Sequence, residues 1–272
     1  MINDSIFIQG KSHNICQDYA ISGITSSGIT YLITSDGCSL LRKTDINIIN
    51  HPTSDVAARI ICHCAKHVLE TENSDNPIPD NFLKIFKINL NMTRMGLGLP
   101  DNYLTDATFQ LLVIKNNKYQ FFRFGDGFFI TKTKNLYNIN YTTFEPNMPY
   151  LTSYWYQDKE IEHQKLVKTT HINLQYNNNF ELINEKKDIN IINEPQDIND
   201  IDMFILTSDG LYDIYDNTNT KINIIDSIKL IFPFKSFNES FIKRKVLNGM
   251  MRKMKIENLY FNDDFTLAGI SI

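Results

Sequence analysis

Two stretches of the sequence end in the same four residues, and each ending supplies an acidic side chain. Residues 31–39 read YLITSDGCS and residues 204–213 read FILTSDGLYD, so an apolar, β-branched run stops at Thr-Ser-Asp-Gly both times. A strand that ends in Asp-Gly places a carboxylate at the rim of a sheet, and the glycine permits a tight turn or a close backbone contact. A single Asp-Gly is usually only a turn, but its repetition suggests a shared task.

Acidic residues adjoin strand-like runs at five places, which are Asp18, Asp36, Asp126, Asp209 and the pair Asp263-Asp264. If the strand ends converge, two carboxylates about 4 Å apart repel by about 4 kcal/mol at an effective dielectric constant of about 20, so the group needs protons or cations. An all-oxygen site favours Mg²⁺ or Mn²⁺ over zinc. Two such ions about 3.5–4 Å apart can activate a water and clamp a transferring phosphoryl group. Two copies of the ending would then each deliver one carboxylate to the same pair of ions.

The first half of the chain predicts strands followed by helices. Strand-like runs occupy 5–8, 19–24 and 29–34, and the turn-forming residues 25–28 predict a hairpin. Helices are expected over about 54–71, after N-capping residues, and over about 80–95, between a proline and a glycine.

From residue 107 the apolar period changes from helical to alternating. Residues 107–135 read as three consecutive strands with antiparallel pairing. A basic amphipathic helix near 238–256 and a strand at 265–272 complete an α+β pattern. The Asn- and Asp-rich residues at about 157–200 predict a polar, loop-rich excursion. No linker composition interrupts the chain, so we expect a single domain over 1–272.

Composition and charge exclude several classes of function. The chain has 272 residues, of which 42% are hydrophobic, and a net charge of −4, which gives no general attraction to nucleic acid. No apolar run approaches the roughly 20 residues of a membrane span, and the N-terminus lacks a signal-peptide pattern. The cysteines form no CxxC pair, which favours reduced thiols. We expect a cytoplasmic monomer. The basic stretch 241–255 is interpreted as a solvated helix face, with a docking patch for an acidic partner as the alternative.

Seven short motifs follow one another along nearly the whole chain: Gly10-Lys-Ser-His-Asn-Ile-Cys-Gln-Asp18, Ser35-Asp-Gly-Cys-Ser39, Ser54-Asp-Val-Ala-Ala-Arg59, Asp106-Ala-Thr108, Gly125-Asp-Gly127, Ser208-Asp-Gly210 and Asp263-Asp-Phe-Thr266. In content and order they resemble the metal-dependent serine/threonine protein phosphatases of the PP2C type (the PPM family), especially the divergent bacterial branch. The resemblance implies a four-layer α/β-β/α sandwich, in which two antiparallel sheets are flanked by helices. It also implies hydrolysis of phosphoserine or phosphothreonine in a protein substrate by a hydroxide that bridges two Mg²⁺ or Mn²⁺ ions, with no phosphoenzyme intermediate.

The resemblance assigns a role to each motif residue. Asp36 resembles the ligand that bridges both ions, and the backbone carbonyl of Gly37 would bind the second ion. Asp209 and Asp263 resemble the remaining ligands of the first ion. Asp18 occupies the position that serves the second ion, mainly through water.

One further ligand and three departures complete the comparison with the family. Asp126 resembles the ligand of a weaker third ion. His13 stands where the family usually has an arginine that binds phosphate, so its phosphate contact would lack the bidentate fork. Gln17 replaces a common glutamate, which predicts weaker binding of the second ion. Cys38 replaces a histidine of the eukaryotic members, so no residue is assigned as the general acid.

Other interpretations remain beside this one. The weakened phosphate and second-metal sites also suit a pseudophosphatase that serves as a binding or regulatory module, and the carboxylates also suit an unrelated metal-dependent phosphoesterase. For Cys62-His63-Cys64 with His67 we favour a packed or surface helix over a zinc site, because positions 62 and 64 point to different sides of a helix. A serine hydrolase is disfavoured because no Gly-x-Ser-x-Gly elbow occurs. Tyr150 and Tyr154 are read as turn and core residues, with substrate contact as the alternative.

Overall fold

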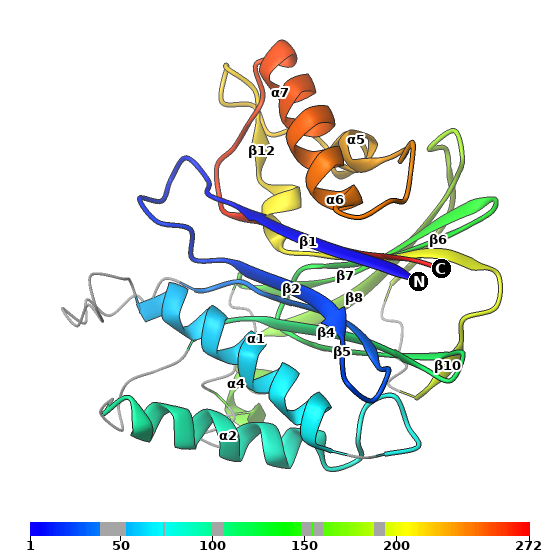
Figure 1. Ribbon diagram of the computed structural model, residues 1–272. Coiled ribbons are helices and arrows are strands. Elements are labelled where there is room, and N and C mark those ends of the chain that lie inside the picture. The colour runs from blue at the N-terminus through cyan, green and yellow to red at the C-terminus, as the bar shows by residue number, and fades with distance from the viewer. Residues whose placement is uncertain (39–52, 73, 99–105, 148–153, 155–159, 188–193) are drawn as a thin grey trace.

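Two antiparallel β-sheets stack face to face, and helices cover the outer face of each sheet (Figure 1). The computed structural model describes residues 1–38, 53–72, 74–98, 106–147, 154, 160–187 and 194–272. The α+β sandwich expected from the sequence is confirmed.

The larger sheet has seven strands in the order β1-β14-β11-β6-β7-β8-β9. Their bounds are β1 Ile2–Ile8, β6 Phe128–Thr133, β7 Leu136–Glu145, β8 Lys168–Asn177, β9 Leu182–Lys187, β11 Ile201–Thr207 and β14 Phe265–Ser271. The second sheet has five strands in the order β10-β5-β4-β3-β2. These are β2 Tyr19–Ile24, β3 Thr30–Ser35, β4 Phe109–Lys115, β5 Lys118–Phe124 and β10 Gln196–Asp197. A small ribbon joins β12 Ile214–Tyr215 to β13 Tyr260–Phe261.

The helices form two outer layers. α1 (Thr53–Thr71) and α2 (Phe82–Gly96) pack together on the five-stranded sheet. The seven-stranded sheet is covered by α5 (Ile224–Ile231), α6 (Phe241–Arg244), a π-helical turn (Lys245–Met250) and α7 (Met251–Glu257). A short α4 (Glu160–Leu166) precedes β8. None of the helices described is both long and apolar enough to cross a bilayer.

Central strands are apolar on both faces because each face is covered. On β3, Ile33 packs toward α1 and α2, whereas its neighbour Leu32 packs between the two sheets. On β11, Ile205 faces the α5–α7 layer and Phe204 faces the other sheet. Burial of one such side chain stabilises the fold by about 1.5–3 kcal/mol. The continuous apolar runs seen in the sequence therefore belong to doubly covered strands.

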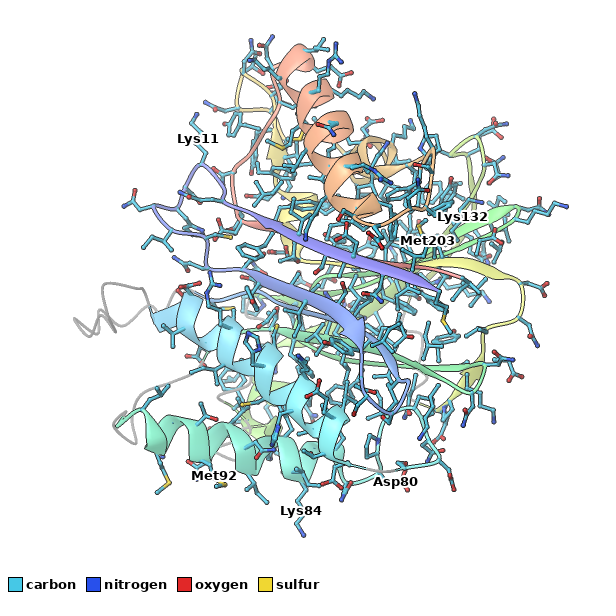
Figure 2. All side chains as sticks on the ribbon, viewed as in Figure 1. Lys11, Asp80, Lys84, Met92, Lys132 and Met203 are labelled. Carbon is cyan, nitrogen blue, oxygen red and sulfur yellow. The ribbon has the colours of Figure 1, made fainter. Side chains whose placement is uncertain are left out.

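Both predicted helices on the five-stranded sheet are present, with small shifts at their ends. On α2, Phe82, Phe86 and Leu90 are buried against α1 and the sheet. Lys84 and Met92 project from the outer side of the same helix (Figure 2). Apolar residues on α2 recur with the 3.6-residue period of a helix, which is why the sequence predicted this helix.

The three strands expected over 107–135 exist, but they do not form one meander. β4 pairs with β5 in the five-stranded sheet, whereas β6 pairs with β7 and β11 in the other sheet. Gly125 and Gly127, both at positive φ, lie in the connection where the chain passes from one sheet to the other. The motif Gly125-Asp126-Gly127 is therefore a crossing point between layers rather than a hairpin turn.

The expectation of a loop-rich excursion over 157–200 is wrong for much of this segment. β8 pairs with β7 along its whole length and also with β9. Asn173 donates to Asn140 (2.7 Å) and Gln175 donates to Asn138 (2.9 Å), so half-buried amide side chains link the two strands on one face of the sheet. Because the Asn-rich composition suggested loops, the alternation of these amides with buried apolar residues was overlooked.

Candidate metal centre

Strand register brings the acidic motifs to one end of the sandwich. In the seven-stranded sheet, Thr207 at the end of β11 lies opposite both Leu267 of β14 and Phe128 of β6. Asp209, Asp263 and Asp126 are each within a few residues of these positions. In the five-stranded sheet, Ser35 lies opposite Tyr19, so Asp36 and Asp18 also share an end. Each Thr-Ser-Asp-Gly ending thus follows an interior strand of one sheet, β3 or β11, at the same edge of the molecule.

Hydrogen bonds hold the two sheets together at this end. Nε2 of the buried Gln110 donates to Oγ1 of Thr34 in its own sheet (3.2 Å) and to the carbonyl oxygen of Thr207 in the other (2.9 Å). The side chains of Asp36 and of Ser208, from the other sheet, are close enough to the carboxyl group of Asp18 to lower its pKa. One crosslink therefore ties together the two strands that carry the twin endings.

Residues 106–108 fix the first ending. The amide of Thr108 donates to the carbonyl oxygen of Asp36 (2.8 Å), and Oγ1 of Thr108 accepts from the amide of Asp36 (3.3 Å). Gly37 forms an isolated bridge with Ala107. The Asp106-Ala-Thr108 motif thus acts as a short brace for the Asp36-Gly37 turn.

Both endings require glycine because another backbone segment passes very close. A Cβ on Gly37 would lie 2.5 Å from the carbonyl oxygens of Gln17 and Ser54. A Cβ on Gly210 would lie 1.9 Å from the carbonyl oxygen of Asp264. Such contacts are far inside normal packing distance, so the glycines allow the acidic segments to approach one another.

For the half-buried Asp36 and Asp209, the ionised form of the carboxyl group is disfavoured when no cation is bound. Burial raises the pKa of Asp36 well above its usual range, and the charges of Asp18, Asp209 and Asp126 raise it further. Burial likewise raises the pKa of Asp209, with added repulsion from Asp126 and Asp263. Carboxylates from both sheets are therefore close enough to oppose one another's ionisation.

Asp18 and Asp126 combine raised pKa values with unused acceptor atoms. Burial raises the pKa of Asp18 to about 7, although the neighbouring Asp36 and Ser208 side chains work against this rise. Burial raises the pKa of Asp126 to about 6, opposed by its own backbone amide and by the Arg123 charge. Within the described part of the chain, Oδ2 of Asp18 and Oδ1 of Asp126 are buried without a hydrogen-bond partner. Buried carboxylate oxygens normally have a partner, so both atoms suit a bound cation.

Asp264 has a different role from the other carboxylates. Its Oδ1 accepts from the amide of Gly10 (2.7 Å), and its Oδ2 accepts from the amide of Gln17 (2.5 Å) and lies 2.9 Å from Nδ1 of His13. Asp264 is almost fully buried. It therefore clamps the loop between β1 and β2 to the start of β14.

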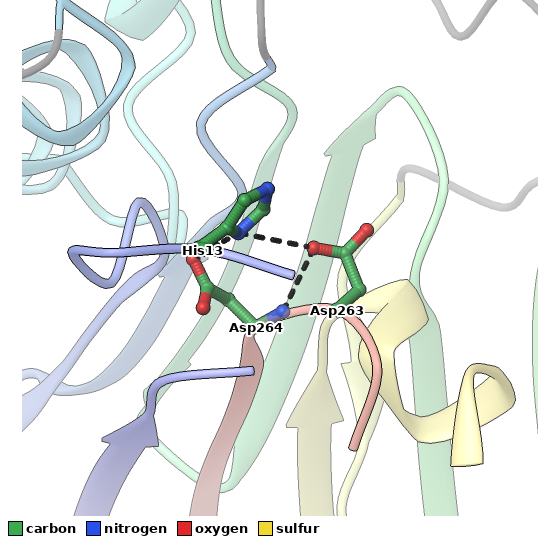
Figure 3. A group of neighbouring side chains, drawn as sticks. All are labelled: His13, Asp263 and Asp264. Carbon is green, nitrogen blue, oxygen red and sulfur yellow. Dashed lines mark hydrogen bonds and ion pairs between the residues drawn. The ribbon is translucent and has the colours of Figure 1, made fainter. Parts of the chain in front are cut away.

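His13 is held between two neighbouring carboxylates (Figure 3). Its Nδ1 lies 3.5 Å from Oδ1 of Asp263 as well as beside Asp264, and the same Asp263 oxygen accepts from the amide of Asp264 (2.8 Å). Burial raises the pKa of Asp263, while that amide and the His13 charge lower it. His13, at the position expected to contact phosphate, is thus attached to the acidic cluster through its Nδ1.

Two groups of side chains compete as an ion site. Among the described residues, His13, Asp263 and Asp264 bring their ligand atoms within 4.8 Å of one another. However, both oxygens of Asp264 already accept hydrogen bonds. The all-oxygen set of Asp18, Asp36, Asp126, Asp209 and Asp263 instead has raised pKa values and unpartnered oxygens. This set fits hard divalent cations better. Asp264 instead holds the neighbouring loop in place through its hydrogen bonds.

Gln17 and Cys38, the other two positions where the chain departs from the family pattern, lie close to the acidic cluster. Oε1 of Gln17 accepts from Oγ of Ser54 at the start of α1 (2.7 Å). Burial and surrounding carboxylates raise the pKa of the Cys38 thiol well above its usual value, so it stays neutral. All four cysteines are free. Tyr150 lies outside the described residues, and the half-buried Tyr154 has its ring 5.3 Å from that of His163.

A cleft of about 490 Å³ opens beside the acidic cluster. Its lining includes Asp126, Asp209 and Asp263, the β7 residues 141–144, and Tyr212, Asp213 and Lys221. Asp126, Asp209 and Asp263 are therefore reachable from a space that could admit part of a larger substrate.

Asp264 and Lys221 were not singled out from the sequence. The Asp263-Asp264 pair marked the place, but which of the two is buried depends on the start of β14. A strand whose side chains alternate between faces makes the second aspartate point differently from the first. No local sequence signal marks Lys221. Its backbone bridges to Tyr215 of β12, and its side chain lines the cleft.

Comparisons with known proteins identify the architecture. No protein-family model matches the sequence, and no curated protein matches it either. The serine/threonine phosphatase Stp1 from Staphylococcus aureus has a similar structure, with a TM-score of 0.56 at 14% identity over 100% of this chain and 95% of that chain. A bacterial serine phosphatase gives 0.54 at 14% identity over 99% and 97% of the two chains. The Mycobacterium tuberculosis serine/threonine phosphatase PstP/Ppp gives 0.51 at 9% identity over 99% and 97%. The chain therefore has the fold of the bacterial PP2C-type serine/threonine phosphatases.

Proposed function

We propose that the chain is a metal-dependent phosphatase that hydrolyses phosphoserine or phosphothreonine in a protein substrate, with residues 1–272 as one domain. The fold it shares with bacterial serine/threonine phosphatases supports this class of reaction. The observation that carries the proposal is the convergence of carboxylates from both sheets at one end of the sandwich, beside a cleft, with raised pKa values and unpartnered oxygens. We further propose that the protein acts as a cytoplasmic monomer, which agrees with its free cysteines.

The acidic side chains divide naturally between two Mg²⁺ or Mn²⁺ ions. Asp36 would be shared, Asp209 and Asp263 would complete one site, and Asp18 with the Gly37 carbonyl would serve the other. When bound, these ions supply positive charge that offsets the phosphoryl oxygens and lowers the pKa of a water for in-line attack on phosphorus.

A third ion, if bound, would be held by Asp126, whose Oδ1 is unpartnered among the described residues. The Arg123 charge favours the ionised form of Asp126. It therefore helps to keep this carboxylate ready for a cation, although it also competes with one for the negative charge.

The rest of the chain's contribution is positioning. Asp264 fixes the loop that carries Asp18, and the brace of residues 106–108 fixes Asp36. The remaining ring nitrogen of His13, Nε2, is the atom left to donate to a phosphate oxygen. Catalysis would then depend on preformed charge complementarity rather than on a protein nucleophile.

The test is hydrolysis of a phosphothreonine peptide and of an aryl phosphate with Mn²⁺ or Mg²⁺ titrated in and EDTA as the blank. Asp209→Asn should abolish turnover while the chain stays folded, because it removes one charge and keeps the shape. Asp202→Asn is the matched control, since Asp202 is an exposed aspartate on the same strand β11. Retained activity in Asp209→Asn would contradict the metal assignment. A wild-type chain that binds Mn²⁺ without turning over either substrate would favour the pseudophosphatase instead.

A further inference from the structure

The cleft beside the acidic cluster contains one cation among its described lining residues, Lys221. Four of the lining side chains are acidic: Asp126, Asp209, Asp213 and Asp263. Mg²⁺ or Mn²⁺ would offset those closest to the strand ends, but not the charge of a substrate that extends along the cleft. A phosphorylated peptide therefore needs a further cation of the protein in this space.

Lys221 is held in place by a rigid turn. Residues 216–220 close a loop between β12 and Lys221, and Oδ1 of Asp216 accepts from the amide of Thr218 (2.8 Å) and the amide of Thr220 (2.9 Å). The amide of Asp216 in turn donates to the carbonyl of Thr220 (3.0 Å), and Lys221 bridges back to Tyr215. The backbone that leads to the lysine is therefore held by hydrogen bonds within this turn.

The side chain of Lys221 is also oriented by its neighbours. Its Nζ lies 3.2 Å from Oδ1 of Asp213 and 4.0 Å from the centre of the Tyr212 ring. Oδ2 of Asp213 accepts from Nδ2 of Asn262, the residue before Asp263. A lysine ammonium has three donors, so one ion pair leaves others for a ligand. Contacts from Lys221 to Asp213 and from Asp213 to Asn262 thus link this ammonium to the segment that carries Asp263.

The state of His13 increases the need for this cation. His13, the residue proposed to contact phosphate, has its Nδ1 already occupied by Asp264. That residue can offer one remaining donor to a phosphate, whereas an arginine offers a planar pair. Part of the task of attracting an anion is thus left to another side chain of the cleft.

We propose that Lys221 forms a cationic subsite that binds an anionic group of the phosphorylated substrate. That group is either the phosphoryl oxygens themselves or a carboxylate close to the phosphorylated residue in the peptide. The inference rests on the proposed phosphatase function and adds a determinant of substrate choice to it.

The experiment compares Lys221→Met, Lys221→Arg and wild type on three substrates: an aryl phosphate, a phosphothreonine peptide with neutral neighbours, and the same peptide with flanking glutamates. Lys229→Met is the matched control, because Lys229 forms a similar ion pair with Asp226 (3.1 Å) at 42% exposure against 35% for Lys221, outside the cleft lining. Loss of a charged contact should raise KM about tenfold in Lys221→Met, with kcat within about twofold of wild type. Lys221→Arg should restore most of the affinity, and Lys229→Met should change neither constant.

The three substrates separate the two sources of the anion. A raised KM for all of them assigns the phosphoryl group to Lys221, and a raised KM for the glutamate-flanked peptide alone assigns the neighbouring carboxylate. Equal KM values for Lys221→Met and wild type on every substrate overturn the subsite and leave the phosphatase function intact.

A binding measurement keeps the two proposals distinct if wild type shows no turnover. Fluorescence anisotropy of the labelled phosphopeptides, with Mn²⁺ present, is compared between Asp209→Asn and the double variant that adds Lys221→Met. Weaker binding by the double variant supports the subsite even in an inactive protein. Equal dissociation constants, or no binding by either chain, overturn it.

Discussion

Nδ1 of His13 and Oδ2 of Asp264 lie 2.9 Å apart, and the same carboxylate accepts hydrogen bonds from the amides of Gly10 and Gln17. A residue next to a proposed metal ligand thus organises the whole loop between β1 and β2. The acidic cluster depends on this clamp, because the loop ends at Asp18.

Replacing Asp264 by alanine should destabilise the fold strongly. The buried amide of Gly10 and the half-buried amide of Gln17 would lose their acceptor, and an unsatisfied buried group costs about 1–3 kcal/mol. Urea denaturation should show a lower midpoint with little change in slope. Asp216→Ala is a suitable control, since Asp216 also accepts three hydrogen bonds but in an exposed turn, and its loss should be clearly smaller. Equal losses for the two variants would show that Asp264 is not the main clamp.

His13→Arg should lower KM for an aryl phosphate in the metal-loaded protein. A guanidinium has five donors, so it can keep a contact with Asp264 and still present two parallel N–H groups to phosphate. The measurement is KM at saturating Mn²⁺, with His67→Arg on the exposed side of α1 as the control for added surface charge. An unchanged KM in His13→Arg would count against phosphate binding at position 13.

Elements that depend on interactions between residues close in sequence were predicted, and elements that depend on distant residues were missed. The helix α1 and the hairpin β2–β3 were predicted because capping, turn residues and periodicity act within a few residues. The separation of β5 from β6 was missed because partner choice depends on the register of β11, far away in the chain. β8 was missed because one of its faces carries half-buried Asn and Gln amides that bond across strands.

The same limit applies to the site. The two Thr-Ser-Asp-Gly endings predicted Asp36 and Asp209 as site residues, since a strand that ends in Asp-Gly is a local feature. The clamping contacts of Asp264 became apparent only from the Gly10 and Gln17 amides in the structure, and the proposed role of Lys221 only from the cleft. Contacts between residues so distant in sequence leave no mark on composition or spacing.

The metal-free protein should lose stability as the pH rises. The pKa of Asp18 is raised to about 7 and that of Asp126 to about 6, whereas an unfolded aspartate titrates at about 3.9. The folded state therefore binds more protons over this range, so the stabilising contribution is full below about pH 4 and is lost as the pH rises through about 7. Urea midpoints in EDTA should be lower at about pH 8 than at about pH 5.

Added Mn²⁺ should oppose this loss, because the ion competes with protons for the same oxygens and binds more tightly as the pH rises. Asp18→Asn should reduce the pH dependence in EDTA, since it removes one of the shifted groups. Asp202→Asn, which changes an exposed aspartate, should leave it intact. A midpoint in EDTA that does not change between the two pH values would contradict the crowding of charge at this site.

Gly210→Ala should damage both the fold and the site, since the new Cβ would lie 1.9 Å from the carbonyl oxygen of Asp264. The backbone of residues 209–210 or of 263–264 must then move, at a cost of about 1–3 kcal/mol for an overpacked position. Either movement separates Asp209 from Asp263, so Mn²⁺ affinity, measured by titration calorimetry, should fall together with the urea midpoint.

Gly96→Ala is the matched control for this change. Gly96 ends α2, and a Cβ there would meet nothing within 4 Å. Alanine is the better helix former by about 1 kcal/mol in a helix interior, so this variant should be as stable as wild type or more so, with unchanged Mn²⁺ affinity. Loss of Mn²⁺ binding in Gly210→Ala alone would show why the chain needs glycine directly after Asp209. If Gly210→Ala instead bound Mn²⁺ as wild type does, the close approach of the second ending to the start of β14 would not be what assembles the site.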